Sequence, residues 1–205
     1  MSRVQLRPFL LLALGASTLF ATGCQTQPRI AGARVKVQPE GRLASVNPSD
    51  IAIAPVEVVA PSAAIPTEAL RRSAGGFLPR KRYSPLRLEN VDNAMVGTEP
   101  ASYRAGALRE DAVLELTVHA WDASLWGVRR TLTVDVEARF VEPGRASGAP
   151  LWTGRLSQRF DFTGLERGAS DDGTLLQLAC DQIMAELLAP LPARDIAVGP
   201  RSAFN

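Results

Sequence analysis

The chain has 205 residues, of which 46% are hydrophobic and 21% are charged. This length suits one domain with short appendages, and the composition is that of a globular protein, which excludes wholesale disorder. The formal net charge of +2 comes from Arg3 and Arg7, without which basic and acidic residues balance. Nucleic-acid-binding proteins carry a basic excess on their folded part, so we expect no nucleic acid as a partner.

Residues 1–23 contain these two arginines, then an apolar stretch of about 15 residues, then small residues, as in a secretory signal. A transmembrane helix needs about 20 apolar residues, so the stretch is too short to span a bilayer. The pattern predicts a signal peptide over residues 1–23.

The four residues "ATGC", Ala21 to Cys24, resemble the lipobox of bacterial lipoproteins. The resemblance implies that Cys24 carries fatty acyl chains such as palmitate and becomes the first residue of the mature chain. Gln25, in place of an aspartate, implies sorting to the outer membrane, with the protein on the periplasmic side. The match departs at Ala21, where leucine is commonest. The alternative is cleavage by ordinary signal peptidase, which would leave a secreted protein with a free Cys24.

The mature chain divides into three parts. Residues 24–50 are polar and interrupted by prolines, which predicts a flexible, lipid-anchored tether with a short strand within "RVKVQPEGRLASV". Residues 51–192 form the expected domain. Residues 193–205 are predicted to be a disordered tail.

The domain begins with an apolar, β-rich run over residues 51–60, which predicts a strand that ends or bulges at Pro55. Thr67 is a candidate N-cap of a short helix that ends at Gly75 and Gly76. Residues 83–91 are a weaker strand candidate, and residues 92–110 are expected to be a loop with one helical turn.

Three stretches, residues 111–124, 130–143 and 150–162, alternate apolar and polar side chains. They predict a three-strand antiparallel meander with one buried and one solvated face. In the first stretch Ala120 falls on the apolar side, and His119 and Trp121 fall on the polar side. Charged residues share the polar face, so we expect cross-strand pairs of Glu137 with Arg155 or Arg159; the members are Glu115, Glu137, Arg139, Arg155, Arg159 and Asp161.

Residues 171–192 predict a helix that covers the sheet. The apolar positions recur at helical spacing: Leu176, Ala179, Cys180, Ile183 and Leu187. Asp171 or Asp172 is expected to cap it, and Pro190 to end it. The fold class is therefore α/β, a mixed sheet that contains the meander and is covered by helices in an α/β sandwich.

Three motifs, "IAIAPVE", "EDAVLELTV" and "GAPLWTG", resemble segments of bacterial envelope lipoproteins. The families are the penicillin-binding-protein activators, the curli secretion lipoprotein and the N-terminal domain of TolB. The resemblance covers roughly residues 51–188, but the first helix is shorter here and no glycine follows "DAVL". It implies the same fold and an envelope protein partner, such as a peptidoglycan synthase or a secretion complex.

No catalytic or metal site is expected. The chain has one histidine, His119, and two cysteines, Cys24 and Cys180, too few for a structural zinc site. His119 lies in mid-strand without a G-x-S-x-G motif, and Cys180 lies in an apolar stripe. Asp171 and Asp172 lack calcium-loop spacing. No phosphate-binding loop is present, so we also expect no cofactor.

Two surface features are candidates for binding. Arg80, Lys81, Arg82 and Arg87 form a basic run that either meets lipid phosphates, lipopolysaccharide or an acidic partner, or is a solvated helix end. A hairpin turn holds aromatic and basic residues that either form a partner-binding tip or fold under the sheet edge; these are Trp121, Trp126, Arg129 and Arg130.

The resulting hypothesis is an outer-membrane lipoprotein that faces the periplasm and acts as a non-enzymatic binding or assembly factor for an envelope protein complex. The alternative is an auxiliary lipoprotein of lipid or lipopolysaccharide transport. The sequence does not indicate an oligomeric state.

Overall fold

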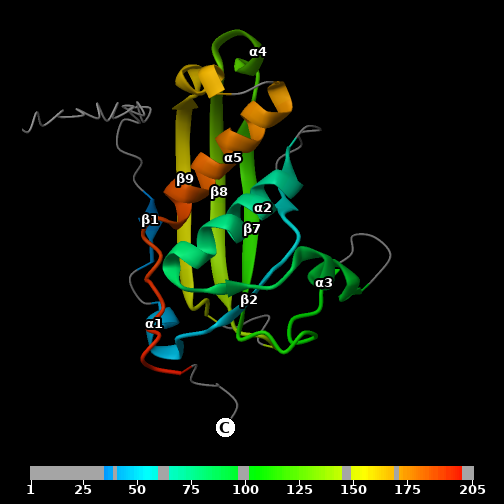
Figure 1. The fold of residues 1–205 in the computed structure, drawn as a ribbon, viewed down its shortest axis with the longest axis vertical. Helices are drawn as coiled ribbons and strands as arrows, with labels where there is room; N and C mark the ends of the chain where they lie inside the picture. Colours follow the sequence, from blue (N-terminus) through cyan, green and yellow to red (C-terminus); the bar gives the residue numbers. More distant parts are fainter. Residues whose placement is uncertain are drawn as a thin grey trace, which may run out of the picture.

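The computed structural model describes residues 35–38, 41–59, 65–96, 102–144, 149–168 and 171–199. The predicted signal peptide, Cys24 and the start of the tether lie outside these residues. The main element of the described chain is a mixed seven-stranded sheet, ordered β1-β9-β8-β7-β2-β4, with β3 also paired to β7 (Figure 1). This confirms the predicted α/β class.

The predicted meander forms the centre of the sheet. Its antiparallel strands are β7 (Ala112–Asp122), β8 (Thr131–Val141) and β9 (Trp152–Asp161). The strands added at its sides are β1 (Lys36–Val37), antiparallel to β9, β2 (Asp50–Ile53) and β3 (Glu57–Val58), parallel to β7, and β4 (Ser84–Pro85), parallel to β2. A separate pair joins β5 (Met95–Val96) to β6 (Ser102–Tyr103).

Five α-helices lie within the described residues: α1 (Leu43–Val46), α2 (Thr67–Phe77), α3 (Leu88–Asn93), α4 (Trp126–Arg129) and α5 (Asp172–Leu188). The described residues also form two 3-10 helices, η1 (Leu78–Lys81) and η2 (Thr163–Gly168). None of these helices is long and apolar enough to span a membrane.

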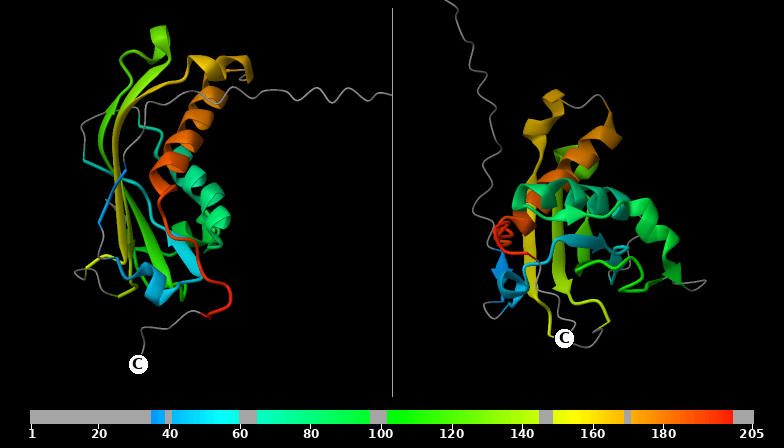
Figure 2. Two further views of the ribbon diagram at one scale, coloured as in Figure 1. Left: turned by 90° about the vertical axis from the view of Figure 1, so that its left-hand side faces the viewer. Right: turned by 60° about the horizontal axis from the view of Figure 1, so that its bottom comes forward.

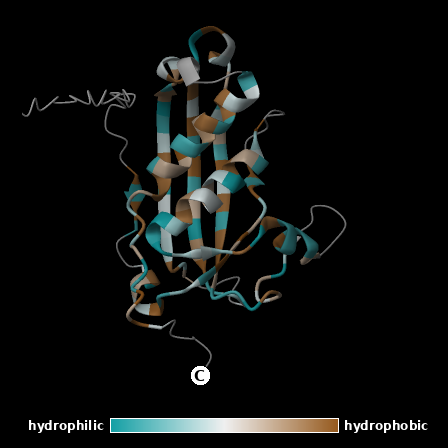
Figure 3. Cartoon of the chain, viewed as in Figure 1, coloured by the Kyte–Doolittle hydropathy of each residue, from teal (hydrophilic) through white to brown (hydrophobic). Residues whose placement is uncertain are grey.

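The helices α2 and α5 cover one face of the sheet, as the edge-on view shows (Figure 2). Apolar and polar residues alternate along β7, β8 and β9 (Figure 3). The apolar set packs against these helices. Part of the other face carries a small second core, in which Ala52, Val113 and Val141 pack with Val91 of α3. The rest of that face is polar.

The alternation of β7 is interrupted by a bulge. Val118 is opposite Val136 and Ala120 is opposite Asp135, the next residue of β8. His119 is therefore one extra residue in β7, with no residue of β8 opposite it. An extra residue exchanges the two faces of all later side chains. Trp121 is therefore buried in the core, 7% exposed, and Ala120 faces solvent. The faces predicted for these two residues were wrong.

Two early elements also differ from prediction. The helix α2 begins after Pro66, without a capping bond from the Thr67 side chain, and continues through Gly75 and Gly76. A glycine commonly ends a helix by adopting a left-handed conformation. Here neither glycine does so, and the left-handed residue is Arg82, which follows η1 and has a φ of 66°. The second strand candidate forms only the two residues of β4 before α3 begins.

The folded domain is longer than predicted at both ends. Before Ile51, the strand β1 pairs with β9, and Leu43 of α1 is 1% exposed. After Pro192, the side chain of Asn47 accepts a hydrogen bond from Asp195 N and donates to the Asp195 and Val198 carbonyls. Parts of the predicted tether and tail therefore belong to the packed structure.

The helix α5 agrees with its predicted pattern except at its start, where Leu175 is buried and the predicted Leu176 is only partly buried. Asp171 caps its start by accepting a hydrogen bond from Thr174 N at 2.8 Å. Cys180 is 0% exposed and belongs to the core, as its place in the apolar stripe predicted. The buried residues of this helix are Leu175, Ala179, Cys180, Ile183, Met184, Leu187 and Leu188.

Candidate interaction surfaces

The turn between β7 and β8 forms a compact tip built on α4. We define the tip surface by Leu125, Trp126, Val128, Arg129 and Arg130. Val128 is 85% exposed and Leu125 is 37% exposed, and Arg129 is exposed beside them. The tip lies at one end of the meander (Figure 1). It presents apolar and cationic side chains together.

The half-buried Trp126 connects this tip to the core. Its ring meets Phe162 edge-to-face, with 5.9 Å between centroids. The Arg130 guanidinium lies 5.7 Å from the centre of the Trp126 ring and also forms an ion pair with Asp172 of α5, at 3.0 Å. The side of the tip that faces the domain is therefore fixed.

The sequence of the turn explains its shape. Asp122 accepts a hydrogen bond from Ser124 N at 2.9 Å, and hydrogen bonds from the side chain and the backbone of Ser124 lower the pKa of Asp122. Arg129 N then donates to the Leu125 carbonyl at 2.8 Å. Arg130 ends the helical turn in a left-handed conformation, φ 47°. These local bonds hold the tip in one conformation.

The four residues predicted for the tip separate in the structure. Trp126 and Arg130 contact each other, and Arg129 is exposed, but Trp121 is buried in the core of the domain. Trp121 is therefore not available to a partner. Val128 was not among the predicted residues. An apolar residue between Gly127 and Arg129 in a turn is the sequence feature that could have indicated its exposure.

The four residues of the predicted basic run make different local contacts. Lys81 Nζ donates to the Ala189 carbonyl at 2.6 Å, at the C-terminus of α5, where a cation is favoured. The Arg80 guanidinium lies 5.7 Å from the centre of the Phe77 ring. Arg82 is in the left-handed region and Arg87 is the extended N-cap residue of α3. Lys81 thus fits the helix-end interpretation.

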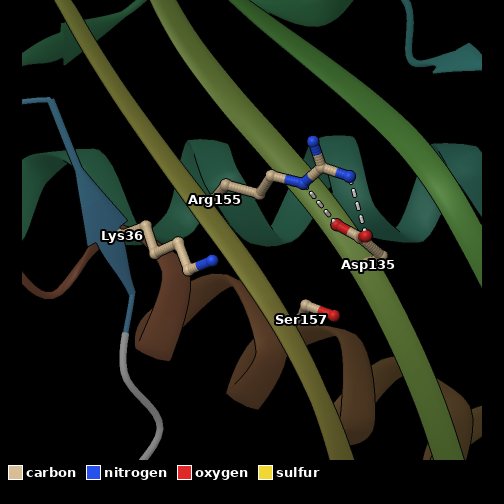
Figure 4. Close-up of a pocket in the computed structure, with 4 residues that line it drawn as sticks. All are labelled: Lys36, Asp135, Arg155 and Ser157. Atoms are coloured by element: carbon tan, nitrogen blue, oxygen red, sulfur yellow. Dashed lines mark hydrogen bonds and ion pairs between the residues drawn. The ribbon is translucent and has the colours of Figure 1, made fainter.

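The polar face of the sheet contains a hollow of about 320 Å³, lined by Lys36, Asp135, Arg155 and Ser157 (Figure 4). Arg155 Nε and Nη2 each donate to the Asp135 carboxylate at 2.8 Å. This bidentate pair lowers the pKa of Asp135 and raises that of Arg155. The side chains of Lys36 and Ser157 border the same hollow from β1 and β9.

The charge pairs on this face differ from the predicted ones. Glu137 is opposite Arg155 in register, but Arg155 bonds the diagonal neighbour Asp135 instead. A long side chain can reach a diagonal neighbour on the same face of a sheet, which explains the choice. Glu137 lies 3.7 Å from His119 Nε2, and Arg139 lies 3.7 Å from Glu115.

The candidate reactive side chains lie apart. His119 is on the polar face, whereas Cys180 is in the core, where burial raises its pKa to about 12 and keeps the thiol protonated. Within the described residues, no group of three or more His, Cys, Asp or Glu side chains is placed to hold a metal ion.

Comparison with known proteins gives similarities of architecture. No protein-family model matches the sequence, and no curated protein matches it. A PelC dodecamer from Paraburkholderia phytofirmans has 14% identity and a TM-score of 0.48, over 80% of this chain and 100% of that one. The lipoprotein GNA1162 from Neisseria meningitidis has 24% identity and a TM-score of 0.43, over 66% and 96%.

The hypothetical protein CT253 from Chlamydia trachomatis has 11% identity and a TM-score of 0.47, over 73% of this chain and 99% of that one. Identities and scores at this level carry no statement about function. The resemblance to penicillin-binding-protein activators, the curli secretion lipoprotein and TolB rests on the sequence motifs alone.

Proposed function

We propose that the protein is a lipoprotein of the outer membrane that faces the periplasm and acts as a non-enzymatic binding or assembly factor for an envelope protein complex. Two features support the proposal: the lipobox at Cys24 and the tip surface. The lipobox places the domain at a membrane, and the tip surface provides the binding element.

The lipobox determines where the domain can work. The link from Cys24 to Val35, the first described residue, spans at most about 40 Å even when fully extended. Two or three acyl chains on Cys24 provide stable anchoring, because each buried methylene contributes about 0.8 kcal/mol. The domain therefore meets its partner near the membrane surface.

The tip surface has the properties of a docking element. Arginine is enriched among the residues that dominate binding energy, whereas valine and leucine are not, so Arg129 is the strongest candidate for a binding contact. Here Trp126 and Arg130 hold the tip in place, while Val128 and Arg129 are exposed. A partner that binds such a rigid tip does not have to order it, which favours affinity.

The experiment is photo- or chemical crosslinking in intact cells, followed by identification of the captured envelope protein. Val128→Asp and Arg129→Glu change the exposed part of the tip without touching the core. We expect each variant to lose the crosslinked partner and to remain folded. Ile196→Asp, at a position that is 67% exposed and outside the tip, is the matched control and should retain it. Capture that persists in both tip variants contradicts the proposal.

The alternative, an auxiliary role in lipid or lipopolysaccharide transport, requires space for an acyl chain within the domain. An acyl chain between helix and sheet would occupy space now filled by fully buried side chains such as Phe140 and Ile183, so α5 would have to move. Mass spectrometry of an organic extract of the purified protein distinguishes the two roles. Retained lipid, other than the anchor on Cys24, favours transport.

A further inference from the structure

The outer edge of β9 is only partly covered. The short strand β1 pairs with Gly154 and Arg155, and no other described strand lies on that side (Figure 1). The segment from Leu156 to Asp161 continues beyond β1, and among the described strands it pairs only with β8. An edge that no described strand covers is a template for pairing with another strand.

The hydrogen bonds at both ends of β9 show which backbone groups face outward. Thr153 directs its carbonyl toward β1, where it accepts a bond from Gln38 N at 3.2 Å. Phe162 directs its N–H the other way, toward the Arg130 carbonyl, at 2.8 Å. Because consecutive residues of a strand alternate between its two edges, Ser157, Arg159 and Asp161 direct their N–H and C=O groups outward.

The side chains along this edge carry complementary charges. Arg159 is exposed, and no hydrogen bond or ion pair joins it to another described residue; its charge still lowers the pKa of Asp122 and of Asp161 in its own chain. Asp161 uses one carboxylate oxygen, Oδ1, to accept bonds from Thr163 N at 3.0 Å and Thr163 Oγ1 at 2.8 Å. Its Oδ2 has no partner in the described part of the chain. These two bonds also lower the pKa of Asp161 and keep it ionised.

We propose that this edge of β9 pairs with the same edge of a second copy of the chain, antiparallel and two-fold symmetric about Phe160. In this register Arg159 of each copy lies opposite Asp161 of the other. The outward backbone groups of both residues then bond across the interface, and the sheet continues from one copy into the next. Such an isologous contact uses one self-complementary patch twice.

The charges select this register over its neighbours. A two-fold axis at Arg159 would place two arginines opposite each other, and an axis at Asp161 would do the same with two carboxylates. An axis at Gln158 would place Asp161 opposite Arg155, whose edge β1 already occupies. Of these registers, the one centred on Phe160 pairs opposite charges along a part of the edge that no described strand occupies.

The test is the mass of the full chain in detergent, measured by light scattering, for Arg159→Asp, Asp161→Arg and an equimolar mixture of the two. The wild type should be a dimer. Each variant alone places like charges opposite each other and should dimerise roughly tenfold or more weakly. In the mixture every cross-strand pair is again attractive, so a heterodimer should form. Arg139→Asp, on the same face of the sheet but within β8, should leave the dimer intact.

A monomeric wild type, or a mixture that stays monomeric while circular dichroism shows both variants folded, overturns the proposal. If a charge variant does not fold, disulfide crosslinking replaces it. Arg159→Cys and Asp161→Cys in two differently tagged copies bring their Cα atoms to about 5.5 Å, within disulfide range. We expect this pair to crosslink and the offset pair Ser157→Cys with Arg159→Cys not to do so. Equal crosslinking of both pairs, or none, contradicts the register.

Discussion

At the scale of single residues, Gly154 of β9 shows how one missing side chain permits the packing of another. A Cβ atom at Gly154 would overlap the indole ring of Trp152, which is 3% exposed and lies edge-to-face against Phe140, with 6.1 Å between centroids. The ring therefore lies over the glycine. Gly154 is needed for this close approach and not for an unusual backbone angle.

Gly154→Ala should lower the free energy of unfolding by about 1–3 kcal/mol, because the displaced ring overpacks the core. Gly76→Ala is the contrasting change: it lies in α2, and a Cβ there meets no atom within 4 Å. It should stabilise the protein by about 0.5–1 kcal/mol, as alanine does relative to glycine within a helix. Urea unfolding of both variants measures the difference, and equal stabilities would contradict the packing argument.

A second residue-scale prediction concerns alkaline pH. Burial raises the pKa of Tyr83 to about 12, while Arg194 opposes the shift, and the hydroxyl donates to the Pro192 carbonyl at 2.8 Å. In the unfolded chain a tyrosine ionises near pH 10. Between about pH 10 and pH 12 the folded state therefore holds one proton more, and stability falls as pH rises.

Below about pH 10 this stabilising contribution of Tyr83 is fully present. Tyr83→Phe removes the proton difference, so its unfolding free energy should fall less steeply than that of the wild type over the same range. Cys180, whose pKa is also raised to about 12, keeps its own contribution in both proteins. Denaturant unfolding at stepped pH measures the two slopes, and identical slopes would refute the assignment.

At the scale of elements, the bulge in β7 marks the limit of the alternating pattern. The three long strands were predictable because their apolar side chains recur at every second position. A bulge leaves no such signal, since one inserted residue only reverses the alternation for the last three or four positions. The burial of Trp121 depends on the offset between Val118 and Ala120, which pairing with β8 determines.

The structure predicts opposite roles for two apolar residues of the same hairpin, the buried Trp121 and the exposed Val128. Trp121→Ala should destabilise the fold by about 3–5 kcal/mol, because it empties a core position. The protein that remains folded should still capture its partner, since the tip surface is intact. Val128→Asp should change stability by no more than about 0.5 kcal/mol, as is usual for exposed positions, yet lose capture. Paired stability and crosslinking measurements on the two variants decide the point.

At the scale of the whole molecule, Asn47 joins the two ends of the folded domain. It is 4% exposed, adopts a left-handed conformation with φ of 53°, and binds the chain around Asp195 and Val198. Asparagine tolerates this conformation well and also provides the donors and acceptor. The C-terminal segment is therefore held by one side chain from the N-terminal side.

Asn47→Gly keeps the left-handed backbone but removes all three side-chain bonds. We expect faster amide exchange and faster proteolysis over residues 195–199, with little change in the core strands. Asn47→Asp retains the bond from Asp195 N but loses both donors, so its effect should be intermediate. Hydrogen-exchange mass spectrometry measures the local opening, and unchanged protection in Asn47→Gly would contradict this role.

The sequence predicted the interior of the molecule better than its borders. Periodicity identified the meander and α5 because their apolar faces are long. The borders depend on contacts between distant segments, such as β1 with β9 and Asn47 with Asp195, which leave no local pattern. The tip was predicted from its tryptophans, but its most exposed apolar side chain is Val128, since Trp121 is buried and Trp126 packs against Phe162.

The proposed function depends most on Cys24, because an anchored domain and a secreted one meet different partners. The direct measurement is fractionation of cells that express the full chain and its Cys24→Ala variant. We expect the wild type to sediment with the outer membrane and the variant to be either released as soluble protein or left unprocessed. A Cys24→Ala protein that is processed normally and stays in the membrane would contradict the lipoprotein assignment and the function built on it.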